Sequence, residues 1–179
     1  MSWDRLLPSD ITGASVEGDG RVLEFTVFGE PTPKGSLRPV PGRGRLTGKT
    51  MLIPDNQTEL LRWAGRVIDA ARSARVAAGM DRPMEAAMVE LEFNFARPAG
   101  HYGSGKNAGQ LLRSAPAEKV TKPDLDKLVR AVYDSLTQAY VVLDDNAIVE
   151  SHERKQFGEP CLCVKVTELA LRTRQEALL

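Results

Sequence analysis

Four aspartates bracket one helix-like segment and are the residues best suited to do chemistry. Asp124 and Asp126 open it, and Asp144 and Asp145 follow its end, in KPDLDKLVRAVYDSLTQAYVVLDD. Ionised carboxylates that come together repel each other unless a cation or a proton compensates them. Hard divalent cations prefer oxygen ligands, so the pattern favours a metal site. A helix of this length returns the chain to a sheet, where we expect the two acidic pairs to meet.

Each acidic pair also has a plainer interpretation. Asp124 can cap the helix, and residues 144–146, Asp-Asp-Asn, have the composition of a turn. Positions i and i+2 of a helix do not face each other, so Asp124 and Asp126 approach one ion only if Asp124 lies at or before the N-cap. Pro123 favours that placement because proline disfavours a helical conformation for the residue before it and is common where a helix begins.

Arg130 lies four residues after Asp126, on the same edge of the expected helix. Its guanidinium can form a surface ion pair with Asp126, form one with Asp134, or bind a phosphate. The sequence leaves these three interpretations open.

Two better-known ion- or phosphate-binding loops are excluded by spacing. Residues 42–50, GRGRLTGKT, resemble a P-loop, but Arg43 stands where the motif requires glycine, and MLIPD follows where a helix should begin. A calcium-binding EF-hand fails because Val129 occupies the position of its required glycine. We therefore expect no nucleotide cofactor.

Overall charge is balanced, but basic residues concentrate in two loops. The 179 residues include 24 basic and 24 acidic side chains, and 42% are hydrophobic, as in an ordinary globular domain. Residues 31–50 carry five basic residues and no acidic one, and residues 97–122 have a net charge of +4. Such Gly- and Pro-rich basic loops are typical of a surface for a polyanion, although solvated loops share this composition.

Hydrophobic periodicity predicts how these residues are positioned. We expect one α+β domain with a mixed sheet and two main helices, in the order β-(hairpin)-α-β-α-β-β. Residues 1–20 form a lead-in, 21–168 the domain and 169–179 a tail. The expected strands are 21–28, 89–95, 148–156 and 161–167; the helices run from an Asn56 capping box to Gly79 and from Leu125 to Ala139. No apolar run suits a membrane span and no signal pattern opens the chain, so we expect a cytoplasmic protein.

The acidic segment resembles the RusA family of Holliday junction resolvases, which occur in phages and prophages. The hallmark of that family is Asp-x-Asp opening a helix, a basic residue one turn later, Asp-(Ala/Ser)-Leu and then Asp-Asp. Here these elements read DLDKLVRAVYDSL and VVLDDNAIVE. The upstream loop, RPAGHYGSGKNAG followed by APAEKVTKPDLDKL, also looks like phage members. The resemblance covers residues 20–168.

The resemblance implies an Mg²⁺-dependent endodeoxyribonuclease, with Mn²⁺ able to substitute, that resolves four-way junctions as a homodimer in recombination, repair or phage DNA processing. Asp124, Asp126 and Asp145 fall on the metal-binding aspartates, with Asp144 beside them. Arg130 falls on the catalytic basic residue, often lysine in the family, so we expect it to stabilise charge rather than donate a proton. Branched DNA would be held by the basic loops, through Lys34, Arg38, Arg43, Arg45, Lys49, Lys106, Arg113, Lys119 and Lys122.

Three other classes of protein remain open at this stage. A non-catalytic protein that binds branched DNA would use its carboxylates only to cap a helix. A metal-dependent phosphohydrolase for small phosphate esters would have no need of the basic loops. A structural phage protein would show no metal-dependent activity.

Overall fold

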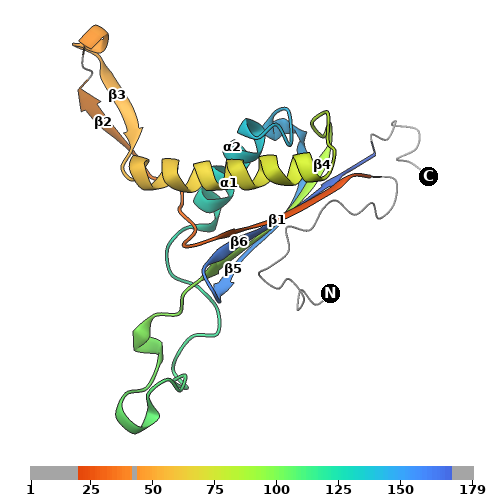
Figure 1. The fold of residues 1–179 in the computed structure, drawn as a ribbon. Helices are drawn as coiled ribbons and strands as arrows, with labels where there is room; N and C mark the ends of the chain where they lie inside the picture. Colours follow the sequence, from red (N-terminus) through yellow and green to blue (C-terminus); the bar gives the residue numbers. More distant parts are fainter. Residues whose placement is uncertain (1–19, 42–43, 171–179) are drawn as a thin grey trace.

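A four-stranded mixed sheet forms the centre of the computed structural model, which describes residues 20–41 and 44–170 (Figure 1). The strand order is β1-β6-β4-β5, with β6 antiparallel to both neighbours and β5 parallel to β4. The strands are β1 (Val22–Phe28), β4 (Ala87–Phe95), β5 (Ile148–Phe157) and β6 (Cys161–Glu168). The expected order and the α+β class are confirmed.

Alternation along the strands creates one apolar face, on which both helices pack. Val89, Leu91 and Phe93 of β4 are at most 2% exposed and share one hydrophobic cluster with residues of both helices. Successive strand residues point to opposite faces, so the intervening Glu90 and Glu92 lie on the other face. The core therefore fixes the helices relative to the strands that follow them.

Helix α1 (Gln57–Ala77) begins after Asn56 and ends before Gly79, as expected, but the predicted capping interaction at its start is absent. Gly79 has a φ of 62°, and the N–H groups of Gly79 and Met80 bond back to the last turn, a conformation that suits glycine. At the other end, the Asn56 side chain makes no capping hydrogen bond. Its Nδ2 instead donates to the Pro33 carbonyl at 2.9 Å. The predicted capping box is wrong because this hydrogen bond uses the Asn56 side chain to hold the segment that precedes the helix.

Helix α2 (Leu125–Gln138) matches the predicted span and packs through Leu128, Val132 and Leu136, each at most 1% exposed. Leu125 and Val129 are partly buried against the same core. The helix thus carries Asp124 and Arg130 on a rigid element.

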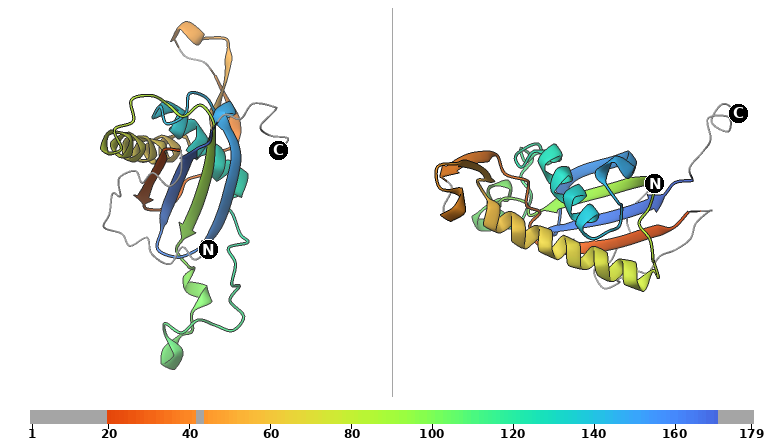
Figure 2. Two further views of the ribbon diagram at one scale, coloured as in Figure 1. Left: turned by 90° about the vertical axis from the view of Figure 1, so that its right-hand side faces the viewer. Right: turned by 90° about the horizontal axis from the view of Figure 1, so that it is seen from above.

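Two projections extend from this body in opposite directions (Figures 1 and 2). The arm, residues 37–41 and 44–54, is a hairpin of β2 (Leu37–Pro41) and β3 (Thr50–Pro54) with the short helix η1 (Gly44–Leu46) near its end. The long loop, residues 96–123, contains η2 (Ala99–His101) and η3 (Gly105–Asn107). Within the described residues, no helix is long and apolar enough to cross a membrane.

Candidate active site

Asp124 occupies the N-cap position of α2, as the spacing requires, but does not cap the helix. Its backbone is extended, with φ −69° and ψ 137°, and its carboxylate accepts no hydrogen bond from the helix N–H groups. The side chain is 52% exposed, and Oδ2 lies 3.3 Å from Nζ of Lys127. Asp126 is exposed in the first turn. The positive end of the helix dipole favours the ionised form of both carboxylates.

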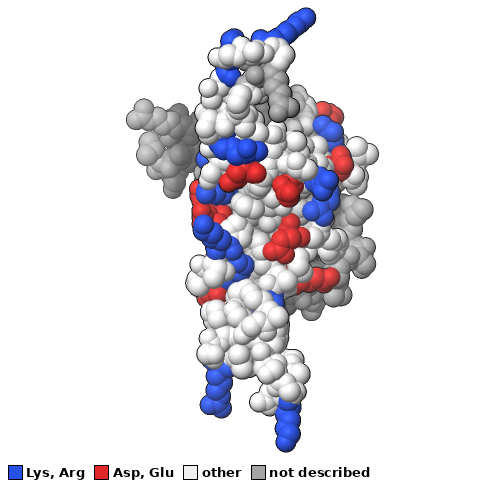
Figure 3. Space-filling model, turned by 90° about the vertical axis from the view of Figure 1, so that its left-hand side faces the viewer, with Lys and Arg blue, Asp and Glu red and all other residues white. Residues whose placement is uncertain are grey.

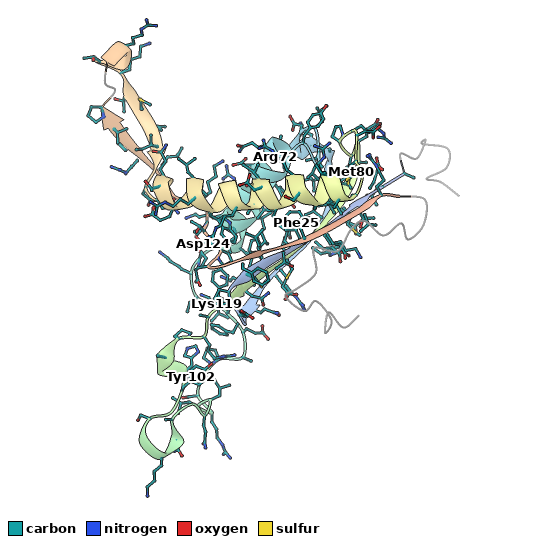
Figure 4. The ribbon with its side chains drawn as sticks, viewed as in Figure 1. Phe25, Arg72, Met80, Tyr102, Lys119 and Asp124 are labelled. Carbon is teal, nitrogen blue, oxygen red and sulfur yellow. The ribbon has the colours of Figure 1, made fainter. Side chains whose placement is uncertain are left out.

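A buried lysine supports the backbone just before Asp124. Lys119 is 9% exposed, and its Nζ donates to Thr121 Oγ1 at 2.9 Å and to the Lys122 carbonyl at 2.5 Å (Figure 4). The ammonium lies 5.0 Å from the ring centroid of Phe95 and 6.0 Å from that of Phe157. Burial lowers the pKa of Lys119. The ammonium of Lys119 is thus turned inward, so we expect it to support the backbone rather than to contact DNA.

Lys155 of β5 completes this support. Its Nζ donates to the carbonyls of Thr121 at 2.9 Å and Pro123 at 2.7 Å. Its charge is a further cause of the lowered pKa of Lys119. Carbonyl groups of residues 121–123 are thus held by two ammonium groups, and the chain enters Asp124 from a fixed direction.

The second acidic pair forms the turn that precedes β5. Asp144 accepts a hydrogen bond from the N–H of Asn146 at 3.0 Å and caps η4 (Asp145–Ala147), so the turn interpretation is confirmed for Asp144. That hydrogen bond, and then hydrogen bonding with Asp145, lowers the pKa of Asp144. The pKa of Asp145 is raised by hydrogen bonding with Asp144 and by its charge. Two adjacent carboxylates therefore share one exposed turn.

The two acidic pairs do not meet within one chain. Lys155, near the end of β5, bonds to Pro123 beside the first pair, whereas Asp144 and Asp145 precede the start of the same strand. From Ile148 to Lys155 the strand rises by about 23 Å, at ~3.3 Å per residue. Accordingly, no three acidic, histidine or cysteine side chains of the described residues are close enough to hold one metal ion. The helix and strand run in opposite directions, which keeps the pairs apart.

The chemistry of each pair nevertheless suits Mg²⁺. This ion is commonly held by one or two carboxylates, with water and substrate phosphate completing its octahedron. Asp124 and Asp126 are exposed, and neither carboxylate oxygen of Asp124 accepts a capping hydrogen bond from the helix. Asp145 is exposed beside Asp144.

Arg130 is exposed and forms no ion pair or hydrogen bond with any described residue. Asp134, one of its two expected partners, instead lies 2.6 Å from Nζ of Lys34, and Asp126 has no ion-pair partner within the described part. Of the three interpretations of Arg130, the structure therefore favours an unpaired cation that can bind a phosphate. Lys34 is also tied to α2 by its N–H, which donates to the Lys127 carbonyl at 2.9 Å.

Most of the other expected DNA contacts lie on the two projections. The space-filling view shows Lys and Arg at the far ends of both, with acidic and further basic side chains on the body between them (Figure 3). Arg43 lies outside the described residues. The exposed basic residues are Arg38, Arg45 and Lys49 on the arm, and Lys106, Arg113 and Lys122 on the long loop.

Arg97 and Lys155 hold the base of the long loop, and the sequence did not single out either. Arg97 stacks over Phe157 at 4.2 Å from its ring centroid and donates to the Pro116 carbonyl at 2.7 Å. Their roles depend on strand pairing that brings Phe157 and Lys155 beside the loop, and no local sequence pattern reports such pairing.

Residues 30–167 match the family model Endodeoxyribonuclease RusA. The chain belongs to the RusA family. The match includes both acidic pairs, Arg130, the arm and the long loop, and it confirms the predicted family and enzyme class. RusA-family proteins are endodeoxyribonucleases that resolve Holliday junctions, so this chain is a hydrolase acting on DNA rather than a structural phage protein. The comparison with curated proteins gives no match.

Proposed function

We propose that this RusA-family protein is an Mg²⁺-dependent resolvase, with Mn²⁺ able to substitute, that cuts four-way junctions by paired symmetric nicks as a homodimer. The observation that carries the proposal is the helix N-terminus of α2, where Asp124 and Asp126 are exposed and Arg130, one turn later, has no ion-pair partner among the described residues. Asp124 lies between the two projections (Figure 4), which carry Lys and Arg at their ends (Figure 3), and this arrangement suits a branched polyanion.

In this proposal the carboxylates bind the metal and Arg130 binds the scissile phosphate. Asp124, Asp126 and Asp145 are the ligands, with Asp144 supplementary. Bound Mg²⁺ would supply an activated water and Lewis-acid stabilisation of the phosphate. The planar guanidinium of Arg130 can donate two parallel hydrogen bonds to phosphate oxygens, and it keeps its proton at neutral pH. Lys119 and Lys155 hold the backbone that presents Asp124.

A second copy of the chain is part of this proposal. One subunit keeps its acidic pairs at opposite ends of α2, and a C2 dimer can place Asp144 and Asp145 of one copy beside Asp124 and Asp126 of the other. Such a dimer has two equivalent sites, which suits a junction of approximate twofold symmetry. Each site then cuts one of two matched strands.

The basic residues of the arm and the long loop would contact DNA phosphates. Such contacts release counterions, so binding is expected to weaken steeply as salt rises. Lys106 and Arg113 on the long loop and Arg38 and Arg45 on the arm can reach separate parts of a branched substrate.

Cleavage of a mobile four-way junction tests the proposal. With Mg²⁺ and excess linear duplex as competitor, we expect two symmetrically placed nicks, and with Ca²⁺ binding without cutting. Binding without cleavage in either Mg²⁺ or Mn²⁺ would show a non-catalytic junction-binding protein. Hydrolysis of small phosphate esters without DNA affinity at low salt would show a phosphohydrolase.

A further inference from the structure

The outer edge of β5 is an unpaired strand edge. β5 pairs with β4 along one side, and its other side has no backbone partner among the described residues (Figure 2). An edge of ten residues offers a row of free N–H and C=O groups that can pair with another strand. This edge is therefore a surface for β-sheet extension.

Several features leave the edge open to a partner. The irregularity in the β4–β5 register is confined to its start, between Ala87 and Met88, and β5 contains no proline. Leu143, five residues before β5, and Val149, the second residue of β5, are 65% and 64% exposed. Large apolar side chains next to an unpaired edge are a combination that association would cover.

The charges along β5 complement each other in one antiparallel register. If two copies pair about His152, Glu150 of each copy lies directly opposite Arg154 of the other. Opposite charges at such cross-strand positions are favourable. Moving the centre by one residue to Glu153 places two glutamates opposite each other and Arg154 opposite His152. The His152 register is thus electrostatically preferred.

Arg154 is already paired with an opposite charge on the neighbouring strand. It forms an ion pair with Glu92 of β4, and Glu150 lies 3.0 Å from Nε2 of His152 on its own strand. In the paired register, Arg154 would lie between Glu92 of its own chain and Glu150 of the second copy. These three side chains would then alternate in sign across the junction between the two sheets.

The same register suits the positions of the acidic pairs. Antiparallel pairing sets the start of one β5 beside the end of the other. Asp145 precedes that start, and Lys155 near the end bonds to Pro123, next to Asp124. The Asp144 and Asp145 pair of each copy is therefore brought toward the Asp124 and Asp126 pair of the other, as the proposed homodimer requires.

We propose that β5 is the homodimer interface, with two copies joining their β5 edges antiparallel about His152 into one continuous sheet. This inference rests on the proposed function for the need of a dimer. The strand edge and the charge pattern specify where the second copy binds.

A charge-swap experiment tests the interface. Glu150→Arg places two arginines opposite each other, and Arg154→Glu places two glutamates opposite each other, so each variant alone repels itself. An equimolar mixture restores opposite charges at both cross-strand positions. Molar mass is measured by light scattering over a dilution series without DNA or metal. Glu59→Arg, an exposed acid on α1, is the matched control.

We expect a dimeric wild type and Glu59→Arg control, a dimer dissociation constant raised about tenfold or more in each β5 variant, and recovery in the mixture. Recovery also shows that both variants are folded. Two dimeric single variants, or a wild type that stays monomeric, would overturn the interface, as would a mixture that stays monomeric.

Junction cleavage in the same samples separates this inference from the proposed function. If the wild type cuts junctions and the β5 variants remain dimeric, the interface is refuted and the proposed function is not. Conversely, a charge-swapped dimer that forms as expected while the wild type fails to cut would refute the proposed function alone.

Discussion

Replacing Lys119 with methionine is expected to weaken the fold and the approach to Asp124 together. The ammonium donates to Thr121 Oγ1 and the Lys122 carbonyl and lies 5.0 Å from the centroid of Phe95. Hydrogen bonds from a charged group contribute about 1.5–3 kcal/mol each, and a cation–π contact about 0.5–2 kcal/mol. These contributions do not add, because one ammonium makes them all, and methionine avoids the desolvation of a buried charge.

A net loss of about 2 kcal/mol follows, which lowers Tm by about 4–8 °C for a domain of this size. Thermal unfolding followed by circular dichroism measures it. At a temperature where the variant remains folded, we expect a slower single-turnover cleavage of a junction and a higher half-saturating Mg²⁺ concentration. Junction affinity in Ca²⁺ should change little, since Lys119 is buried.

Lys106→Met is the matched control, because Lys106 is exposed on the long loop and the charge change is identical. It should leave Tm unchanged and weaken junction binding. If Lys119→Met instead behaved like Lys106→Met, with normal Tm and weaker binding, Lys119 would contact DNA and the inward role derived from the structure would be refuted.

Three further outcomes are expected. Arg130→Gln should lower the cleavage rate about 10²–10³-fold with junction affinity in Ca²⁺ nearly unchanged, and Arg130→Lys should restore part of the rate; equal rates for all three proteins would exclude a transition-state role. Replacing Arg38 and Arg45 on the arm together with glutamine should reduce the slope of log affinity against log salt by about 2, and an unchanged slope would remove the arm from the DNA contacts. Hydrogen bonding with Arg21 lowers the pKa of Glu168. The contribution of Glu168 to the stability of the fold is therefore present above the ordinary carboxyl pKa of about 4.3. It is lost as pH falls through the lower pKa that Glu168 has in the folded protein. Urea unfolding should show Glu168→Gln destabilised at pH 7 and the difference shrinking in acid; a constant difference would contradict this ion pair as the cause.

Local patterns in the sequence were enough to predict the elements and the position of Asp124. Alternation marked β4, a 3.6-residue period marked both helices, and Gly79 marked the end of α1 because it adopts a positive φ. The Asp-rich spacing also identified the family, which the family match confirmed.

Contacts between distant segments account for what the sequence did not predict. The parallel pairing of β5 with β4 sends the second acidic pair to the far end of α2, so the pairs do not meet in one chain. Lys119 turns inward because Phe95 and Phe157, from two different strands, meet beside it. The Asn56 side chain does not cap α1 because it donates a hydrogen bond to the Pro33 carbonyl instead. In each case the decisive partner lies far away in the chain.

Asp126→Asn most directly tests the claim that carboxylates at the start of α2 carry out metal-dependent cleavage. The change removes a negative charge with almost no change in shape, and Asp69→Asn on the exposed surface of α1 is its control. Single-turnover cutting of a mobile four-way junction in Mg²⁺ is measured beside junction binding in Ca²⁺. We predict that Asp126→Asn binds the junction and loses cutting by about 10²-fold or more, while Asp69→Asn cuts normally. Undiminished cutting by Asp126→Asn would contradict the assignment.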